Sequence, residues 1–267
     1  MNRAGIALAV VAALGMGATR AAGAPTLAVS HLFGGTGADE GHAVAVDGAG
    51  RIYVAGGTDS SDLATTAGAP QPALAGSTDA FVARFEPDGS LSYLTYLGGT
   101  GADAAYAIAV DGDGNAVVAG QTSSGDFPAT GDAFQQMLAG GDDGWVARLD
   151  AEGDLSWASY LGGGTGGIGF SEAALGVARD AAGNVYVTGR AEAGFPTTDG
   201  AAQEELGGGG RDAFVAVLAP DGSELVYATY LGAAGDDEGT GIAVDASGAA
   251  YVGGHTINLD AFPTTPG

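Results

Sequence analysis

The segment Tyr96-Leu-Gly-Gly-Thr-Gly-Ala-Asp-Ala-Ala-Tyr-Ala-Ile-Ala-Val110 runs directly into Asp111-Gly-Asp-Gly114 and Asn115-Ala-Val-Val-Ala119. Small and β-branched residues at 107–110 and 116–119 predict two short strands. Asp at the first and Gly at the fourth position of 111–114 predict a tight turn between them. The segment is therefore expected to form an antiparallel hairpin.

Two further strands are predicted downstream, over Trp145–Leu149 and Leu155–Leu161. A long loop with Gly, Ser and Pro, from Gln121 to about Asp142, separates them from the first hairpin. The turn Ala151-Glu-Gly-Asp154 joins the two strands. One unit therefore has four short strands, here called a to d in chain order.

This unit repeats along the chain, because four independent markers recur in one order. One of these markers is the Asp of an Asp-x-x-Gly sequence. Its four copies, Asp47, Asp111, Asp180 and Asp245, are 64, 69 and 65 residues apart. The repeated elements are Tyr-Leu-Gly at 96–98, 160–162 and 230–232; Asp-x-x-Gly from each marker Asp; Asp79-Ala-Phe-Val-Ala-Arg with its counterparts from Asp143 and Asp212; and Phe-Pro at 127–128, 195–196 and 262–263, replaced by Leu63-Ala64 in the first copy. The Phe-Pro pairs are expected to anchor the loops that carry them.

Four short antiparallel strands in a repeated unit predict an all-β fold, a β-propeller of four-stranded blades. The period exceeds that of common propeller repeats because of the long loop between strands b and c. A right-handed β-helix is the competing fold, but its coils are shorter and lack paired hairpins. With 51 glycines in 267 residues, an all-helical protein is excluded, since each interior Gly costs a helix about 1 kcal/mol relative to Ala.

The ordered pattern Tyr-Leu-Gly-Gly, Ala-Val-Asp-x-x-Gly-Asn, Thr-Gly, Phe-Pro-Thr-Thr and Gly-Gly-x-Asp-Ala-Phe-Val-Ala resembles the SBBP family, the bacterial β-propeller repeat of cell-surface proteins. The resemblance covers essentially residues 26–267. It implies a secreted or surface-displayed propeller and carries over no catalytic residues. The third unit departs from the pattern by an insertion around Gly164–Glu172.

The repeat domain is expected over 25–267, in units of approximately 32–95, 96–159, 160–229 and a partial 230–267. Residues 26–33 match a strand d, and the chain ends after a strand b, so about 3.75 blades are present, below the usual minimum of four. We expect a piece of a longer propeller, with a dimer that shares blades as the alternative. Open blade edges would favour self-association.

Residues 1–24 have a short positive start, an apolar centre from Ala4 to Ala18 and small residues before Pro25. This pattern predicts a signal peptide, cut between Ala21 and Ala24, and export from a bacterial cell to its surface or surroundings. A buried Ala-rich helix is the alternative. The apolar run is too short for a comfortable membrane span, so no transmembrane segment is expected after cleavage.

The chain carries 32 acidic and 8 basic residues, with a formal net charge of −24. Such a surface repels phosphate backbones, so nucleic-acid binding is not expected, whereas cations and cationic partners suit it. The absence of cysteine excludes thiolate metal sites, disulfides and a cysteine nucleophile.

The loops 58–78, 121–142 and 190–211 should lie on one face of the propeller together with the acidic d–a loops, and any binding site is expected on this long-loop face. Its ligand would be a protein or a carbohydrate. Calcium is the candidate cofactor. Two oxygen-rich groups are candidate metal sites: Asp111, Asp113 and Asn115 in an a–b turn, and Asp236, Asp237 and Glu238 in a d–a loop. The turn-forming role explains the first group equally, and a solvated loop explains the second.

The histidines His31, His42 and His255 share no metal-ligand spacing, and no nucleophile elbow, zinc motif or phosphate loop is present. The sequence thus predicts a non-enzymatic scaffold or binding module. A propeller-based carbohydrate-active hydrolase or lyase is the alternative, because paired carboxylates are abundant.

Overall fold

The computed structural model describes residues 7–8, 13–15, 26–164, 172–258 and 262, and all its regular elements are β-strands. Three four-stranded antiparallel sheets follow one another along the chain, and a two-stranded sheet follows them. Blade 1 is β4 (Asp39–Val46), β5 (Ile52–Thr58), β6 (Asp79–Phe85) and β7 (Leu91–Leu97); blade 2 is β8 (Asp103–Val110), β9 (Ala116–Thr122), β10 (Asp143–Leu149) and β11 (Leu155–Leu161); blade 3 is β12 (Ala173–Arg179), β13 (Val185–Ala191), β14 (Asp212–Leu218) and β15 (Leu225–Leu231); half-blade 4 is β16 (Asp237–Val244) and β17 (Ala250–Thr256).

These blades confirm the predicted all-β propeller fold of four-stranded blades. In blade 2, strands a, b and c each extend beyond the segments predicted for them. The a–b turn forms as expected: the Gly114 N–H donates to the Asp111 carbonyl at 3.2 Å, and Gly114 has a φ of +92°. That backbone conformation favours glycine. The unit boundaries predicted at 96, 160 and 230 fall inside the last strand of each blade, because the Tyr-Leu-Gly motif ends strand d.

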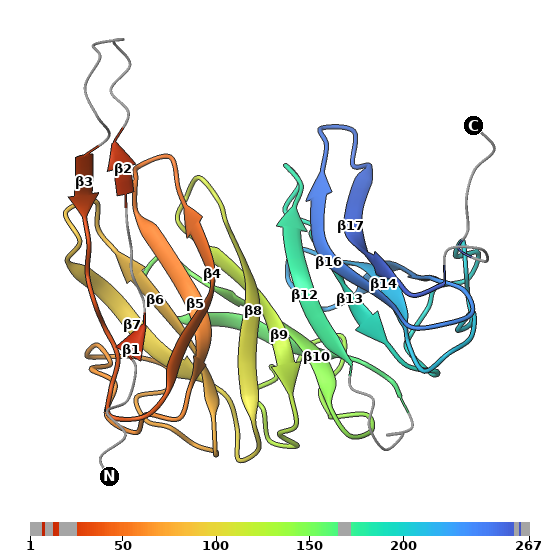
Figure 1. Ribbon diagram of the computed structural model, residues 1–267, viewed down its shortest axis with the longest axis horizontal. Helices are drawn as coiled ribbons and strands as arrows, with labels where there is room; N and C mark the ends of the chain where they lie inside the picture. Colours follow the sequence, from red (N-terminus) through yellow and green to blue (C-terminus); the bar gives the residue numbers. More distant parts are fainter. Residues whose placement is uncertain (1–6, 9–12, 16–25, 165–171, 259–261, 263–267) are drawn as a thin grey trace.

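The blades stand side by side in an open arc, with the a-strands β4, β8, β12 and β16 along one side (Figure 1). Successive blades pack face to face, so their middle strands are buried on both faces. One hydrophobic cluster joins blades 1 and 2 around Tyr53, Val82 and Trp145. A second joins blades 2 and 3 around Val146 and Phe214. The core therefore lies between blades, which makes each junction the unit of stability.

The two ends of the arc differ from the middle. At the first blade, Phe33 packs on a third cluster that includes Phe81 and Phe85, while Val44 and Val46 stay 65% and 60% exposed. At the other end, half-blade 4 packs on blade 3 and leaves Tyr251 62% exposed. These exposed apolar groups lie where the predicted self-association would occur; self-association stays a prediction.

Residues 26–33, which match a strand d in sequence, do not join the terminal half-blade in the described structure. The strand there is β3 (Thr26–Val29), and it pairs with β2 (Ala13–Gly15), with Leu27 opposite Leu14. The short strand β1 (Ala7–Leu8) runs parallel to β4. The N-terminal strands and the half-blade lie at opposite ends of the arc (Figure 1), so they cannot share a sheet. Within the described residues, no helix is long and apolar enough to cross a membrane.

Candidate functional site: the long-loop face and the blade junctions

The long b–c loops and the d–a loops form one connected surface, as predicted. In blade 2, Asp126 Oδ1 accepts hydrogen bonds from the Thr100 amide at 2.8 Å and from its hydroxyl at 2.9 Å. The Ser124 hydroxyl accepts one from the Gly101 amide at 2.8 Å. Blade 1 repeats both contacts, between Asp62 and Thr36 and between Ser60 and Gly37. The bonds from Thr100 hold the pKa of Asp126 below its usual value.

The aromatic residue of each Phe-Pro pair fastens its loop to the blade beneath. The Phe127 ring lies 5.0 Å from Trp145 and 5.7 Å from Tyr160. The Tyr160 hydroxyl accepts the Phe127 N–H at 3.0 Å and donates to the Ser124 carbonyl at 2.7 Å. Blade 3 repeats the arrangement with Phe195, Phe214 and Tyr230. The predicted loop anchors are therefore confirmed, and Leu63 replaces the phenylalanine in blade 1.

Beneath these loops, each junction holds two carboxyl side chains that are almost fully buried. One begins strand c of a blade, and the other comes at or just before strand a of the next. The pairs are Asp79 with Asp103, Asp143 with Glu172, and Asp212 with Asp237. Sequence reasoning used Asp79, Asp143 and Asp212 only as repeat markers. The missed signal was the recurrence of an acidic residue at the start of a strand that is otherwise apolar.

The glycine of each Tyr-Leu-Gly motif lies between the two carboxyls. A Cβ atom at Gly98 would lie 2.7 Å from Asp103 Oδ2 and 2.9 Å from Asp79 Cγ. At Gly162 it would lie 2.5 Å from Glu172 Oε2 and 2.6 Å from Asp143 Cγ. Real Cβ atoms are essentially never found so close to such atoms, so the motif requires glycine because the carboxyls occupy the space of a side chain.

Backbone amides and one glutamine satisfy most oxygens of these carboxyls. Asp143 Oδ2 accepts from Gln135 Nε2 at 2.8 Å and from the Ala139 amide at 2.9 Å. Glu172 Oε2 accepts from the Gly163 amide at 2.7 Å. Asp143 Oδ1 has no hydrogen-bond partner among the described residues. Two acidic groups buried together disfavour their charged forms.

Burial is accordingly the main cause of the raised pKa values at the junctions. It raises the pKa of Glu172 to about 7 and that of Asp143 to about 6, against backbone hydrogen bonds that lower both. The pKa values of Asp79, Asp103 and Asp212 are raised for the same reason. All six carboxyl side chains are almost fully buried, which favours their neutral forms.

The candidate calcium group in the a–b turn is used for other contacts. Asp111 Oδ1 accepts the amides of Asp113 and Asn115 at 3.0 and 2.9 Å. Its Oδ2 accepts from Asn115 Nδ2 at 2.8 Å and pairs with Arg179 of the next blade at 2.7 Å. These bonds together lower the pKa of Asp111, although partial burial opposes them. The carboxylate thus forms the turn and ties two blades.

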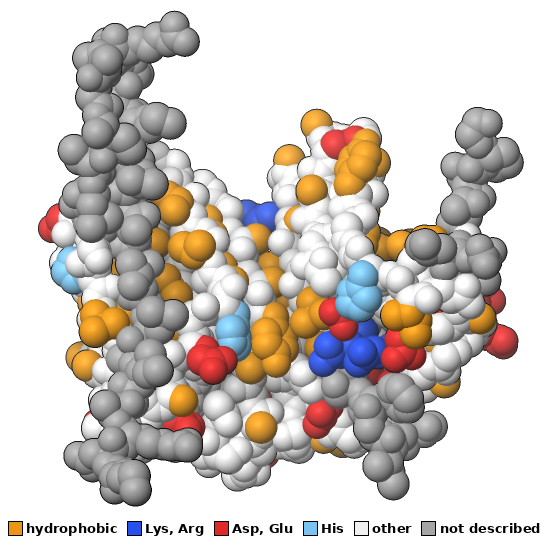
Figure 2. Space-filling model, viewed as in Figure 1, with side chains coloured by type: hydrophobic (Ala, Val, Ile, Leu, Met, Phe, Trp, Pro, Cys, Tyr) orange, Lys and Arg blue, Asp and Glu red, His pale blue; other side chains and the backbone are white. Residues whose placement is uncertain are grey.

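The three candidate ligands of the d–a loop point to different partners. Asp236 Oδ1 accepts the Gly210 amide at 3.0 Å, Asp237 is buried beside Asp212, and Glu238 pairs with Arg190 at 3.0 Å. Figure 2 shows Arg side chains directly against acidic ones on this face. Within the described ranges, no three His, Cys, Asp or Glu side chains are grouped to hold a metal ion. Calcium binding stays a prediction, which a calorimetric titration tests.

A shallow pocket of about 240 Å³ opens on the long-loop face between the a-strand and the b–c loop of blade 2. Its lining includes Tyr106, Gln121, Ser123 and Asp142. Gln121 Nε2 donates to Asp142 Oδ2 at 2.9 Å, and His42 of blade 1 lies 5.2 Å from the Tyr106 ring. An aromatic ring beside amide, hydroxyl and carboxylate groups is suited to bind a polar ligand with apolar faces.

Three segments of the chain match the family model SBBP, described as a beta-propeller repeat: residues 30–64, 93–128 and 226–262. These three segments are SBBP β-propeller repeats. The resemblance drawn from the repeated motifs is confirmed. Among curated proteins, the regulatory protein FlaEY of Caulobacter vibrioides is 28% identical over 189 residues, which are 65% of this chain and 18% of FlaEY. The chain thus spans less than a fifth of the length of that relative.

Proposed function

We propose that this chain is an exported, non-enzymatic propeller module that binds a ligand through its long-loop face outside the cell. The observation that carries the proposal is the repeated bonding of d–a loops to b–c loops, as between Thr100 and Asp126. Loops held this way form a preorganised surface, which lowers the entropy cost of binding. The N-terminal pattern at 1–24 supports export.

The pocket beside Tyr106 favours a carbohydrate as the ligand. A sugar ring presents apolar C–H faces to an aromatic ring and hydroxyls to groups such as Gln121 and Asp142. A protein partner is the other ligand expected from the sequence. Both classes bind at an extracellular surface without requiring a reaction.

The test is a glycan array probed with the purified protein, followed by titration of any glycan retained. Tyr106→Ala should weaken binding at least about tenfold, which corresponds to about 1.4 kcal/mol. Met137→Ala is the matched control, because Met137 is 76% exposed on another part of the loop. A parallel pull-down of extracellular proteins that recovers a protein, with no glycan retained on the array, would identify a protein ligand. If neither class is retained, or if Tyr106→Ala binds as well as the wild type, the proposed surface is wrong.

The enzymatic alternative places its acid and base where substrate can reach them. Asp143 and Glu172 have the raised pKa values of acid catalysts but lie buried beneath the loops, 0% and 2% exposed. This burial supports the non-enzymatic proposal. Incubation with polysaccharides at pH near 5 and near 7 should release no new reducing ends or unsaturated sugars, and their release would establish the enzyme instead.

A further inference from the structure

Two equivalent blade junctions differ at the outer rim of the propeller, where the long loop of one blade meets the c–d turn of the next. Junction 1–2 lies between blades 1 and 2, and junction 2–3 lies between blades 2 and 3. At junction 2–3, the Phe134 amide in the long loop of blade 2 donates to the Gly222 carbonyl in the c–d turn of blade 3 at 2.9 Å. The equivalent positions at junction 1–2 are Pro70 and Gly153, sharing the offset of the surrounding repeat. Proline has no N–H, so this bond cannot form at junction 1–2.

The strand-d aromatic residue differs as well. At junction 2–3, Trp157 Nε1 donates to the Pro220 carbonyl at 3.0 Å. Its equivalent at junction 1–2 is Tyr93, whose side chain is 4% exposed and whose hydroxyl has no hydrogen-bond partner among the described residues. A buried hydroxyl without a partner is costly. The tyrosine therefore retains an unmet bonding capacity at the rim.

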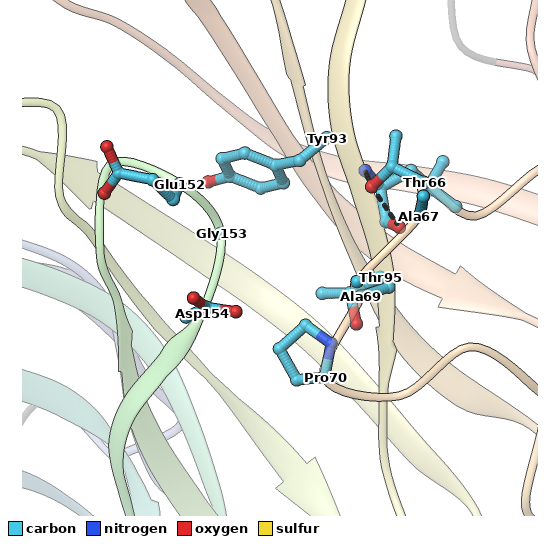
Figure 3. A pocket seen from close by; sticks show the side chains of 11 residues that line it. Thr66, Ala67, Ala69, Pro70, Tyr93, Thr95, Glu152, Gly153 and Asp154 are labelled. Atoms are coloured by element: carbon cyan, nitrogen blue, oxygen red, sulfur yellow. Dashed lines mark hydrogen bonds between the residues drawn. The ribbon is translucent and has the colours of Figure 1, made fainter.

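A pocket of about 190 Å³ lies where these two contacts are missing. Figure 3 shows Tyr93 reaching toward the 152–154 turn, with Asp154 across from Pro70. Ala67, Ala69 and Pro70 supply apolar contacts on the loop side. The hydroxyls of Thr66 and Thr95 bond to backbone groups of strand d and the loop. The polar groups left for a ligand are the exposed Glu152 and Asp154 carboxylates, whereas the Tyr93 hydroxyl is itself fully buried.

The charges around this pocket favour a positive ligand. Glu152 and Asp154 give it two exposed carboxylates, and the whole chain carries a net charge of −24. The nearby cation is Arg84, which lies 5.3 Å from the Tyr93 ring centroid. Its guanidinium already donates to the Ala151 carbonyl and pairs with Glu86 at 3.3 Å. Arg84 thus leaves the two turn carboxylates without neutralisation.

We propose that the rim pocket at junction 1–2 binds an organic cation, the ammonium or guanidinium group of a partner's Lys or Arg side chain or of a small amine. Both groups donate hydrogen bonds and accept none, which matches the two carboxylates. The alkyl stem of such a side chain packs on apolar surface while its charged end stays polar, as the alanines and Pro70 allow. This pocket is separate from the proposed ligand site beside Tyr106, so the two proposals are tested independently.

The test is an NMR titration that follows the backbone amides of Gly68 and Gly153. The probes are Nα-acetyl-lysine methylamide and Nα-acetyl-arginine methylamide for a protein source, and glucosamine for a small amine. Nα-acetyl-glutamine methylamide and glucose are the uncharged counterparts. Saturable shifts with the cations and none with the uncharged probes are expected. Preference for the amino-acid derivatives identifies a protein side chain, and preference for glucosamine identifies a small amine.

Variants separate this pocket from general attraction to an acidic surface. The double variant Pro70→Phe, Tyr93→Trp introduces the residues that close junction 2–3, and it should abolish the saturable shifts. Asp154→Asn should weaken binding about tenfold, as expected for one lost charge-assisted contact. Glu224→Gln removes the same charge from the c–d turn of blade 3 and should leave the affinity unchanged.

Three results would overturn the proposal. The first is the absence of saturable shifts with every cation, which would leave a pocket filled by water alone. The second is equal binding by wild type and the closed double variant, which indicates non-specific attraction. The third is equal binding of glucose and glucosamine, which indicates a polyhydroxyl site. Circular dichroism of each variant verifies that the propeller remains folded.

Discussion

Junctions 1–2 and 2–3 have the same interior and different rims. Both bury a carboxyl pair beside a motif glycine, and both place a c–d turn glycine on an aromatic ring, Gly153 on Tyr93 and Gly222 on Trp157. At the rim, only junction 2–3 has the two bonds to the neighbouring turn. The interior of a junction is thus fixed by packing, whereas its edge tolerates substitutions that open a pocket.

The hairpin side of the propeller differs between the same junctions. At junction 1–2, the Tyr53 hydroxyl donates to the Gly114 carbonyl at 3.1 Å. At junction 2–3, the equivalent residue is Val117, and the Arg179–Asp111 pair links the blades instead. On the hairpin side, blades 1 and 2 are therefore linked by a tyrosine-to-carbonyl hydrogen bond, and blades 2 and 3 by an ion pair.

The largest effect should come from disturbing the interior that both junctions share. Gly98→Ala and Gly162→Ala each force a methyl group against two buried carboxyls, so each should lower the free energy of unfolding by about 3 kcal/mol. Urea denaturation measures the loss. Gly112→Ala is the control, because nothing lies within 4 Å of the added Cβ. Near-wild-type stability of both motif variants would show that the carboxyls move aside freely.

The stability of the protein should depend on pH through the buried carboxyl pair of junction 2–3. Because burial raises the pKa of Glu172 to about 7, the folded state favours its protonated form. Its stabilising contribution is fully present below the usual value of 4.5 and is lost as the pH rises through about 7. Glu172→Gln should remove about 3 kcal/mol of that pH dependence.

Thermal unfolding across this pH window makes the measurement. The Glu224→Gln variant, changed at an exposed site, should show the same change of melting temperature with pH as the wild type. A Glu172→Gln protein with an unchanged slope would assign the pH dependence to the general repulsion of the acidic surface.

Rim variants should separate the bonded junction from the open one. Trp157→Phe removes a donor and leaves the Pro220 carbonyl unpaired, at a cost of about 2 kcal/mol. Tyr93→Phe removes a buried hydroxyl that has no partner among the described residues, so stability should stay the same or increase slightly. Paired denaturation curves compare them. An equal loss in both variants would mean that the Tyr93 hydroxyl has a bonding role after all.

The smallest effect is expected on the hairpin side. Tyr53→Phe loses the bonds from the hydroxyl to Gly114 and Asp47, each at 3.1 Å, and should cost about 1 kcal/mol. Tyr251→Phe is the matched control, since Tyr251 occupies the same strand position in half-blade 4 and is 62% exposed. A comparable loss in the control would remove the hydroxyl-to-carbonyl contact as an explanation.

Repetition made much of this architecture predictable from the sequence. The spacing of Asp47, Asp111, Asp180 and Asp245 gave the blades, and the Phe-Pro pairs gave the loop anchors, because each pattern depends on residues close in sequence. The carboxyl pairs were not predicted. Asp143 and Glu172 come together only when two blades stack, and their burial follows from contacts between distant segments. The pocket at Pro70 needed the same knowledge of the neighbouring turn.

Several donors that cross from one blade to the next end on main-chain oxygens. Tyr53 and Tyr186 reach the carbonyls of Gly114 and Gly248, Trp157 reaches that of Pro220, and Arg84 that of Ala151. Every residue carries a carbonyl, so a turn can change its side chains and still accept a hydrogen bond from the adjacent blade. These contacts therefore place little constraint on the turn sequences, so repeated blades can diverge in their turns while the bonds between neighbouring blades are kept.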